Sequence, residues 1–312
     1  MPDRSDRYRP KVPRYAARHE IRGVSYHVNL WGDRDAPLLV LLHGWGDAGS
    51  TFQFVVDALQ DDWFVVAPDW RGFGKSRHRT YGYWFPDYLA DLDELLAIYS
   101  PDEPARVAGH SMGANILSLY GGVMPERIAK LVNIEGFGLR NSDPAEAPKR
   151  YREWIEAQQR NRGYSRYERF EELAQRVNKR SPTLADDRAR FVAERWAEVD
   201  EEGKVALRAD PAHKIRNPVL YRRAEAEACW HAVTAPVLFV IGGNTDFNSP
   251  DMLWVDPDHA FGAFPRLTKL TIPGAGHMVH FEQPGALAAA IEEFMLERGG
   301  PSTAGDPSTT VR

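Results

Sequence analysis

Residues 107–113 read Val-Ala-Gly-His-Ser-Met-Gly, so a serine stands between two glycines. An apolar run typical of a strand precedes Ser111, and a helical pattern begins directly after it. Glycines at positions 109 and 113 remove the Cβ atoms that would clash in a sharp strand-to-helix turn. Such a turn exposes the serine hydroxyl, and the following helix directs its N-terminal N–H groups toward a developing oxyanion. The arrangement predicts a nucleophilic serine.

A serine hydroxyl is a poor nucleophile at neutral pH and needs a base within hydrogen-bonding reach. His277 is the best candidate, because it lies in a glycine-rich loop directly after the last predicted strand. His280, three residues later, is its rival. His43 and His110 flank the predicted site, and we expect them to hold loops by hydrogen bonds.

The base in turn needs a carboxylate that fixes its tautomer and stabilises the imidazolium. Asp246 is the preferred candidate, because it follows a predicted strand at residues 236–241 and gives the chain order serine, acid, histidine. Glu135 is the alternative, since it ends the strand at residues 128–134 and would lie near the same edge of the sheet.

Two backbone N–H groups are expected to form the oxyanion hole. Met112 supplies one, because it directly follows the serine. Trp45 supplies the other, in the sequence His-Gly-Trp that follows an early apolar run. Each such donor is typically worth about 100- to 1000-fold in rate.

Alternating strands and helices are needed to bring the serine, the histidine, the carboxylate and the oxyanion donors to one edge of a sheet. Continuous apolar runs indicate strands that are buried on both faces, as in a mainly parallel sheet covered by helices. The fold class predicted is therefore α/β, with an antiparallel pair at residues 19–31. The other expected strands are residues 37–42, 63–67, 106–109, 128–134, 236–241 and 267–272, and the expected helices are residues 51–59, 88–99, 112–122 and 282–296.

The composition changes after residue 138. Residues 141–231 are dominated by Arg, Glu, Ala and aromatic residues, with helical spacing and no clear strand. We therefore expect a helical cap inserted into one α/β domain. The predicted organisation is an N-terminal arm at 1–17, a core at 18–138 and 233–298, the cap at 139–232 and a flexible tail at 299–312.

The bulk properties narrow the class of protein. The 312 residues carry a net charge of -5, which argues against a nucleic-acid or anionic-membrane partner. The single cysteine, Cys229, excludes an intrachain disulfide and fits a reducing compartment. The charged N-terminus lacks the apolar stretch of a secretory signal, and no apolar run is long enough to span a bilayer. We expect a cytoplasmic protein of undetermined oligomeric state.

Four motifs in order give the chain a resemblance to the cap-bearing group of the α/β-hydrolase superfamily. They are residues 43–45, residues 69–76, residues 109–113, and Gly276-His277 followed by residues 282–284. The resemblance covers about residues 18–138 and 233–298. It implies a core of about eight strands, a triad at the carboxyl edge of the sheet, a helical lid in the insertion and no required metal or organic cofactor.

The resemblance also narrows the reaction. Relatives that act as epoxide hydrolases or haloalkane dehalogenases carry an aspartate nucleophile, so Ser111 implies an acyl-enzyme route. We expect a serine hydrolase that cleaves a carboxylic ester of a small to medium substrate. Alternatives with the same triad are C–C bond, amide or lactone hydrolysis and a haloperoxidase-like side reaction. An alternative of another class is a non-catalytic member that binds a ligand or a protein.

Overall fold

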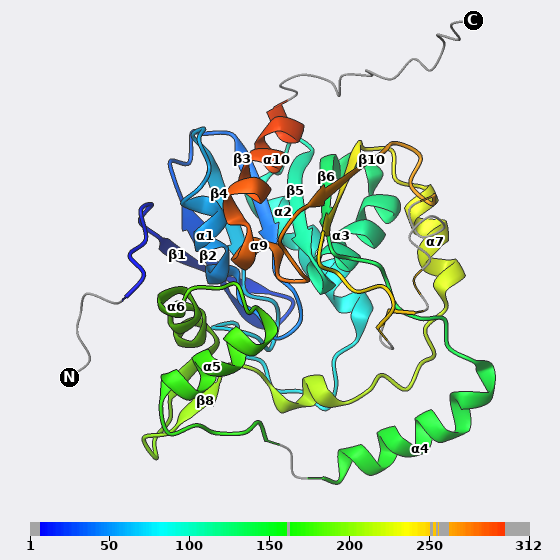
Figure 1. Ribbon diagram of the computed structural model, residues 1–312. Helices are drawn as coiled ribbons and strands as arrows, with labels where there is room; N and C mark the ends of the chain where they lie inside the picture. The colour runs from blue at the N-terminus through cyan, green and yellow to red at the C-terminus, as the bar shows by residue number, and fades with distance from the viewer. Residues whose placement is uncertain (1–6, 161–162, 250–251, 254, 256–261, 297–312) are drawn as a thin grey trace, which may run out of the picture.

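The computed structural model describes residues 7–160, 163–249, 252–253, 255 and 262–296. Over these residues an eight-stranded sheet runs in the order β1-β2-β4-β3-β5-β6-β9-β10 (Figure 1). Strands β1, β2 and β4 pair antiparallel, and the pairs from β4 to β10 are parallel. The strands are β1 (Tyr15–Ile21), β2 (Val24–Trp31), β3 (Leu38–Leu42), β4 (Phe64–Pro68), β5 (Ala105–His110), β6 (Ile128–Ile134), β9 (Val237–Gly242) and β10 (Leu267–Ile272).

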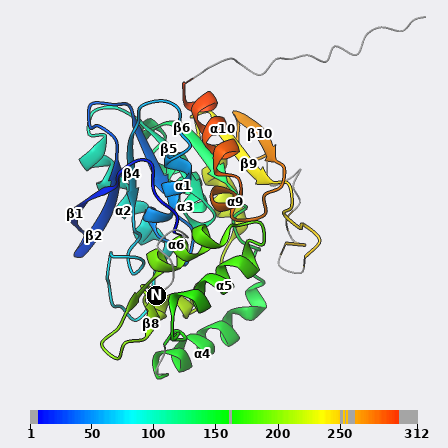
Figure 2. The same cartoon turned by 60° about the vertical axis from the view of Figure 1, so that its left-hand side comes forward.

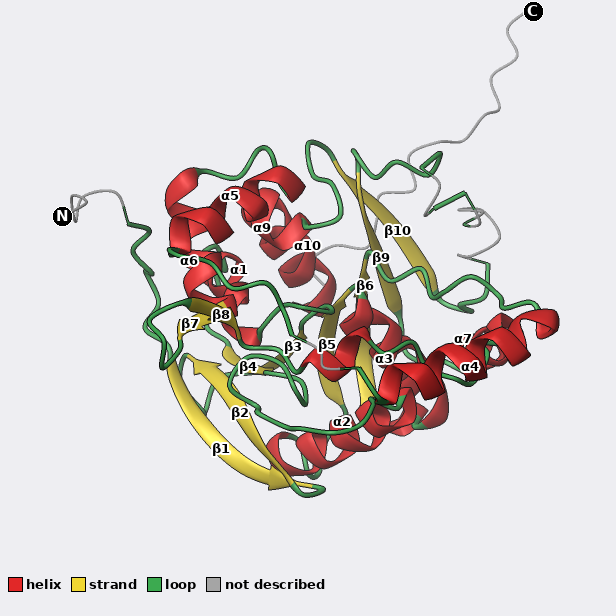
Figure 3. Cartoon of the chain, turned by 90° about the horizontal axis from the view of Figure 1, so that it is seen from below, coloured by secondary structure: helices red, strands yellow, loops and turns green. Residues whose placement is uncertain are grey.

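Helices cover both faces of the sheet. Helices α2 and α3 lie on one face, and α1, α9 and α10 lie on the other, as the view from below shows (Figure 3). Each face buries its own apolar cluster, so strands such as β4 are buried along their whole length. The predicted α/β fold class is confirmed. The helices are α1 (Gln53–Val56), α2 (Phe85–Tyr99), α3 (Met112–Val123), α9 (Val279–Glu282) and α10 (Pro284–Leu296).

A long insertion separates β6 from β9. Its helices α5 and α6 pack against each other beyond one end of the sheet, and α4 lies apart from them at the same end (Figures 1 and 2). Helix α7 packs against α3 instead. Apolar residues of α5 and α6 form a third cluster that also contains Phe54 and Phe281 of the α/β core. The elements of the insertion are α4 (Ala147–Gln158), α5 (Phe170–Arg180), α6 (Asp186–Trp196), β7 (Ala197–Val199), β8 (Val205–Leu207) and α7 (Arg223–His231).

Three elements differ from the sequence prediction. Strand β1 begins at Tyr15, earlier than expected, because its few apolar residues give a weak pattern while its backbone pairs along the whole of β2. The insertion contains the short β7–β8 hairpin, whose turn includes Gly203 at a φ of 79°. The helix expected at residues 51–59 is a 3-10 turn (Gly49–Phe52) followed by the short α1.

The predicted tail at residues 299–312 and the first six residues of the predicted arm lie outside the described residues. Within the described residues, no helix combines the length and apolar character needed to cross a membrane.

Candidate active site

Ser111 stands at the turn between β5 and α3. Its backbone has a φ of 50° and a ψ of -112°, a conformation that non-glycine residues seldom adopt. The backbone N–H of Ser111 donates to the carbonyl of Ile134 at 2.8 Å and so anchors the turn to β6. A Cβ on Gly109 would lie 2.6 Å from the carbonyl carbon of Gly113, and one on Gly113 would overlap the carbonyl oxygen of Leu42. Both glycines are therefore required by close backbone approach.

His277 reaches Ser111 from the loop between β10 and α9. Its Nε2 lies 3.1 Å from the Ser111 Oγ, and its Nδ1 lies 3.1 Å from the Oε2 of Glu135. A carboxylate can only accept, so Nδ1 carries the proton and the lone pair of Nε2 faces the serine hydroxyl. The His277 side chain is about half exposed, with 52% of its surface accessible.

Glu135 is fully buried directly after β6. Its Oε1 accepts the backbone N–H of Gly242 at 2.7 Å and the hydroxyl of Thr245 at 2.8 Å, while its Oε2 faces His277. Its backbone φ of 57° lies in the left-handed region, which residues other than glycine seldom adopt. Three donors thus hold one buried carboxylate in a fixed orientation against the imidazole ring.

The preference for Asp246 as the partner of the histidine is corrected by this geometry. Asp246 is exposed, and its carboxylate accepts the backbone N–H of Asn248 at 2.9 Å in a local turn. Glu135, the alternative, occupies the position expected of Asp246. The physical reason is that the loop after β9 turns away at Asp246 and presents Gly242 and Thr245 to Glu135 instead. Thr245 was missed because a threonine in a loop carries no distinguishing pattern.

The two predicted oxyanion donors lie beside Ser111 in sequence or in space. Met112 is the first residue of α3. A Cβ on Gly44 would lie 3.2 Å from the Cβ of Ser111, so the backbone that leads to Trp45 passes next to the serine. The Trp45 side chain is half exposed and its ring contacts Phe73. The role of these N–H groups stays a prediction.

His43 and His110 hold neighbouring loops, as expected. The Nε2 of His43 accepts the backbone N–H of Trp70 at 2.8 Å, and the Nε2 of His110 donates to the carbonyl of His277 at 2.8 Å. Burial lowers the pKa of His43. Burial, with the nearby His280 and His277, holds the pKa of His110 well below its usual value, so its ring stays neutral.

A buried network beside these rings centres on Asp47. Its oxygens accept hydrogen bonds from the backbone N–H of Ala48, the hydroxyl of Thr51, the indole of Trp196 and the Nε2 of His280. Burial by itself raises the pKa of Asp47, but the hydrogen bonds from His280 and Trp196 and the charges of His280 and His43 together outweigh it and lower the pKa. The indole of Trp196 thereby joins α6 of the insertion to the loop after β3.

Asp47, His110 and His280 are also close enough to be considered as metal ligands, since one polar atom of each lies within 4.8 Å of the others. Both oxygens of Asp47 already accept hydrogen bonds, however. Asp47 contacts only one of the two histidines, His280, through a hydrogen bond. This arrangement fits a hydrogen-bonded support for the loops better than a metal site.

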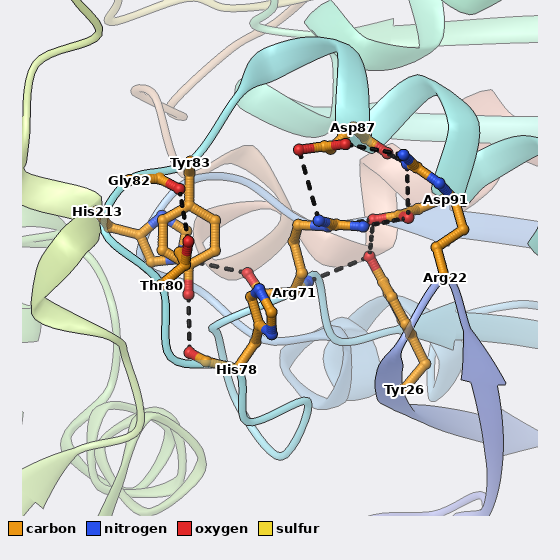
Figure 4. Close-up of polar contacts among 10 residues, drawn as sticks. All are labelled: Arg22, Tyr26, Arg71, His78, Thr80, Gly82, Tyr83, Asp87, Asp91 and His213. Atoms are coloured by element: carbon orange, nitrogen blue, oxygen red, sulfur yellow. Dashed lines mark hydrogen bonds and ion pairs between the residues drawn. The ribbon is translucent and has the colours of Figure 1, made fainter.

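In the motif at residues 69–76, Arg71 makes contacts that hold the loop after β4 in place. The guanidinium of Arg71 pairs with the buried Asp91 of α2 at 2.5 and 2.6 Å, and Tyr26 of β2 donates to the same carboxylate at 2.5 Å (Figure 4). Arg22 adds ion pairs to Asp87 and Asp91. The network fixes the loop after β4 to β2 and α2.

The insertion closes a small cavity over the serine. The cavity has a volume of about 230 Å³ and lies between the α/β core and α5 and α6. This volume is below the roughly 300–1,000 Å³ of common ligand pockets. The lining residues are Gly44, Trp45, Gly46, Asp47, His110, Ser111, Val177, Arg180, Ser181, Trp196, His277, Met278 and Phe281.

A family model described as the alpha/beta hydrolase fold matches residues 37–284, which is most of the chain and includes Ser111, Glu135 and His277. The chain belongs to the α/β-hydrolase fold family. This agrees with the resemblance inferred from the motifs. The names of its relatives support a hydrolase.

Relatives of this α/β hydrolase carry serine hydrolase and esterase names. A serine hydrolase-like protein of Danio rerio is 27% identical over 91% of this chain and 87% of its own length. Esterase YbfF of Escherichia coli is 26% identical over 82% of this chain and 92% of its own length. Among solved structures, the thioesterase domain from the curacin biosynthetic pathway superimposes with a TM-score of 0.78 at 22% identity, covering 89% of this chain and 99% of that domain. The last similarity concerns the fold alone.

Proposed function

We propose that this α/β hydrolase is a serine hydrolase that cleaves a carboxylic ester of a small substrate through an acyl-enzyme. The observation that carries the proposal is the unbroken line of contacts from the Ser111 hydroxyl through the His277 ring to the buried carboxylate of Glu135. Both contacts of 3.1 Å lie within the reach that proton transfer between such groups requires.

In the proposed acylation, the Ser111 Oγ attacks the ester carbonyl while Nε2 of His277 takes its proton. The carbonyl oxygen becomes an oxyanion, which the backbone N–H groups of Trp45 and Met112 stabilise. Glu135 stabilises the imidazolium that forms, without itself becoming protonated. His277 then gives the proton to the departing alkoxide, and the acyl group stays on the serine.

In the proposed deacylation, His277 takes a proton from a water molecule, which attacks the acyl carbonyl. The second tetrahedral intermediate collapses when His277 protonates the Ser111 Oγ, and the acid leaves. The half-exposed His277 ring is open to that water from the cavity.

The proposal is tested by labelling with a small fluorophosphonate, read by intact-mass spectrometry. We expect one adduct on the wild type and none on Ser111→Ala of equal thermal stability. A panel of esters, amides, lactones and diketones then identifies the bond, with turnover lost by about a million-fold in Ser111→Ala. An unlabelled but well-folded wild type would contradict the proposal and favour a non-catalytic binding protein.

A further inference from the structure

Arg180 is among the residues that line the cavity, together with Ser111 and His277. It is the last residue of α5, and its side chain is exposed. Within the described part of the chain, Arg180 forms no ion pair, whereas Arg190 on the neighbouring α6 is paired with both Glu171 and Glu194. The guanidinium is therefore not neutralised by a carboxylate of the described residues and can pair with a ligand.

Ser181, the next residue along the chain, also lines the cavity. The residue is 1% exposed and lines the cavity next to Arg180, and its Oγ has no hydrogen-bond partner among the described residues. A buried hydroxyl without a partner is unfavourable, and a ligand oxygen that accepts its proton would satisfy it. The adjacent backbone is fixed, because the N–H of Ser181 donates to the carbonyl of Val177 at 3.0 Å.

The remaining charges of the cavity do not neutralise Arg180. Asp47 is the one carboxylate among the described lining residues, and its oxygens are held by His280, Trp196, Thr51 and a backbone N–H. A guanidinium offers two parallel N–H groups that match the two oxygens of a carboxylate. The small volume of about 230 Å³ leaves room for a short substrate rather than a bulky one.

We propose that Arg180 and Ser181 form a subsite for a carboxylate, so that the preferred substrates are small esters that carry a free carboxylate group. This inference rests on the proposed ester hydrolysis at Ser111 and specifies its substrate class. Arg180 and Ser181 bind the far end of the substrate and take no part in proton transfer at the reacting carbonyl.

The test compares kcat/KM for two pairs of esters. Monomethyl glutarate and methyl pentanoate differ in a carboxylate at the end of an acyl chain of equal length, and 4-carboxyphenyl acetate and phenyl acetate differ in a carboxylate on the leaving group. We expect the wild type to prefer the anionic ester in one of the pairs. In Arg180→Met the ratio of anionic to neutral kcat/KM should fall about 10- to 100-fold, mainly through KM.

Three further variants sharpen the result. Arg180→Lys keeps the charge without the paired N–H groups and should recover part of the ratio, and Ser181→Ala should lower the ratio by about three- to tenfold. Lys179→Met is the matched control, because Lys179 is an exposed cation next to Arg180 that does not line the cavity. We expect the Lys179→Met ratio to equal that of the wild type.

The carboxylate subsite is overturned if the wild type prefers the neutral ester in both pairs, or if Arg180→Met and Arg180→Lys, folded as judged by Tm, leave both ratios unchanged. Fluorophosphonate labelling separates this failure from failure of the proposed function. Labelling of Ser111 without a change in the ratios contradicts only the subsite. A folded wild type without labelling and without turnover contradicts both proposals.

Discussion

Glu135 combines a left-handed backbone conformation with a fully buried carboxylate, two features that are each unfavourable for a glutamate. The surrounding structure holds it there through the N–H of Gly242, the hydroxyl of Thr245 and the ring of His277. A residue kept in such a state by several partners is typical of a functional site. The position of the proposed acid, Glu135, therefore depends on the backbone turn directly after β6.

Substituting Glu135→Gln should lower kcat/KM by about 10⁴-fold, because a neutral amide neither stabilises the imidazolium nor enforces the productive tautomer. Asp246→Asn, in the exposed turn after β9, should stay within about threefold of the wild type, as is usual for a surface substitution. The measurement is ester turnover with Tm as the check on folding. A loss above a hundredfold in Asp246→Asn together with an active Glu135→Gln would return the role to Asp246.

For single residues, the sequence was sufficient to predict Ser111 and His277, which the structure brings into contact. Both carry a local pattern, because one is a serine flanked by glycines and the other is a histidine directly after the last strand. The choice between Asp246 and Glu135 depends on a long-range contact. Both follow strands of the parallel sheet, and only the path of the loop after β9 decides which carboxylate reaches the ring.

In the strand-to-helix turn at Ser111, the backbone at Gly109 packs closely against that of Gly113. Gly109→Ala should destabilise the fold by a few kcal/mol, on the order of the cost of overpacking a filled site, because the new methyl would lie 2.6 Å from backbone atoms of Gly113. Gly285→Ala is the matched control, since a Cβ there meets nothing within 4 Å in α10. Denaturant unfolding compares the two, and equal midpoints would contradict this account of the turn.

The ion network of Figure 4 is the second element with a measurable role, since it ties β2, the loop after β4 and α2 together. Asp91→Asn should lower the free energy of unfolding by about 3–5 kcal/mol, because it removes the buried counter-charge of the Arg71 guanidinium and leaves only the partly exposed Asp87, at 3.6 Å. Glu94→Gln changes an exposed carboxylate on the same helix and should have little effect. Similar losses in both variants would speak against a specific contribution of the network.

Elements were predictable where the apolar pattern was strong. The buried runs of β3, β4 and β9 gave strands at the right places, because continuous apolar residues in a parallel sheet leave an unambiguous signal. The β7–β8 hairpin was not predicted, since three residues per strand are too few to show alternation. Strand β1 extended further than expected because backbone pairing with β2, rather than side-chain burial, holds it.

The molecule as a whole buries several histidines as neutral rings, which couples its stability to pH. The ring of His213 stacks on that of Tyr83, with ring centroids 3.5 Å apart (Figure 4). It also stacks on Phe73, with ring centroids 3.7 Å apart, and burial lowers the pKa of His213 to about 3. Burial lowers the pKa values of His43 and His110 as well. In the unfolded chain a histidine takes up its proton at about pH 6.5.

Protonation therefore favours the unfolded chain, and the stability that neutral His213 provides is complete above about pH 6.5 and is lost as the pH falls toward 3. At pH 5 this residue alone should account for a loss of about 2 kcal/mol. The measurement is the free energy of unfolding at pH 8 and pH 5, in the wild type and in His213→Gln.

We expect a smaller difference between the two pH values in His213→Gln than in the wild type, whatever the absolute stability of the variant. His231→Gln, which changes an exposed histidine of α7, should keep the wild-type difference. A difference in His213→Gln as large as that of the wild type would show that His213 is not responsible.

The position of Glu135 directly after β6 has one more consequence, for how the chain can be divided. Ser111 and Glu135 both precede the long insertion, whereas His277 follows it, and the hydrogen-bonded neighbours β6 and β9 lie on opposite sides of it. Two polypeptides produced by a break within the insertion would each lack part of the proton relay. Ester turnover would then return only when the halves associate, which would make this enzyme a reporter of fragment complementation.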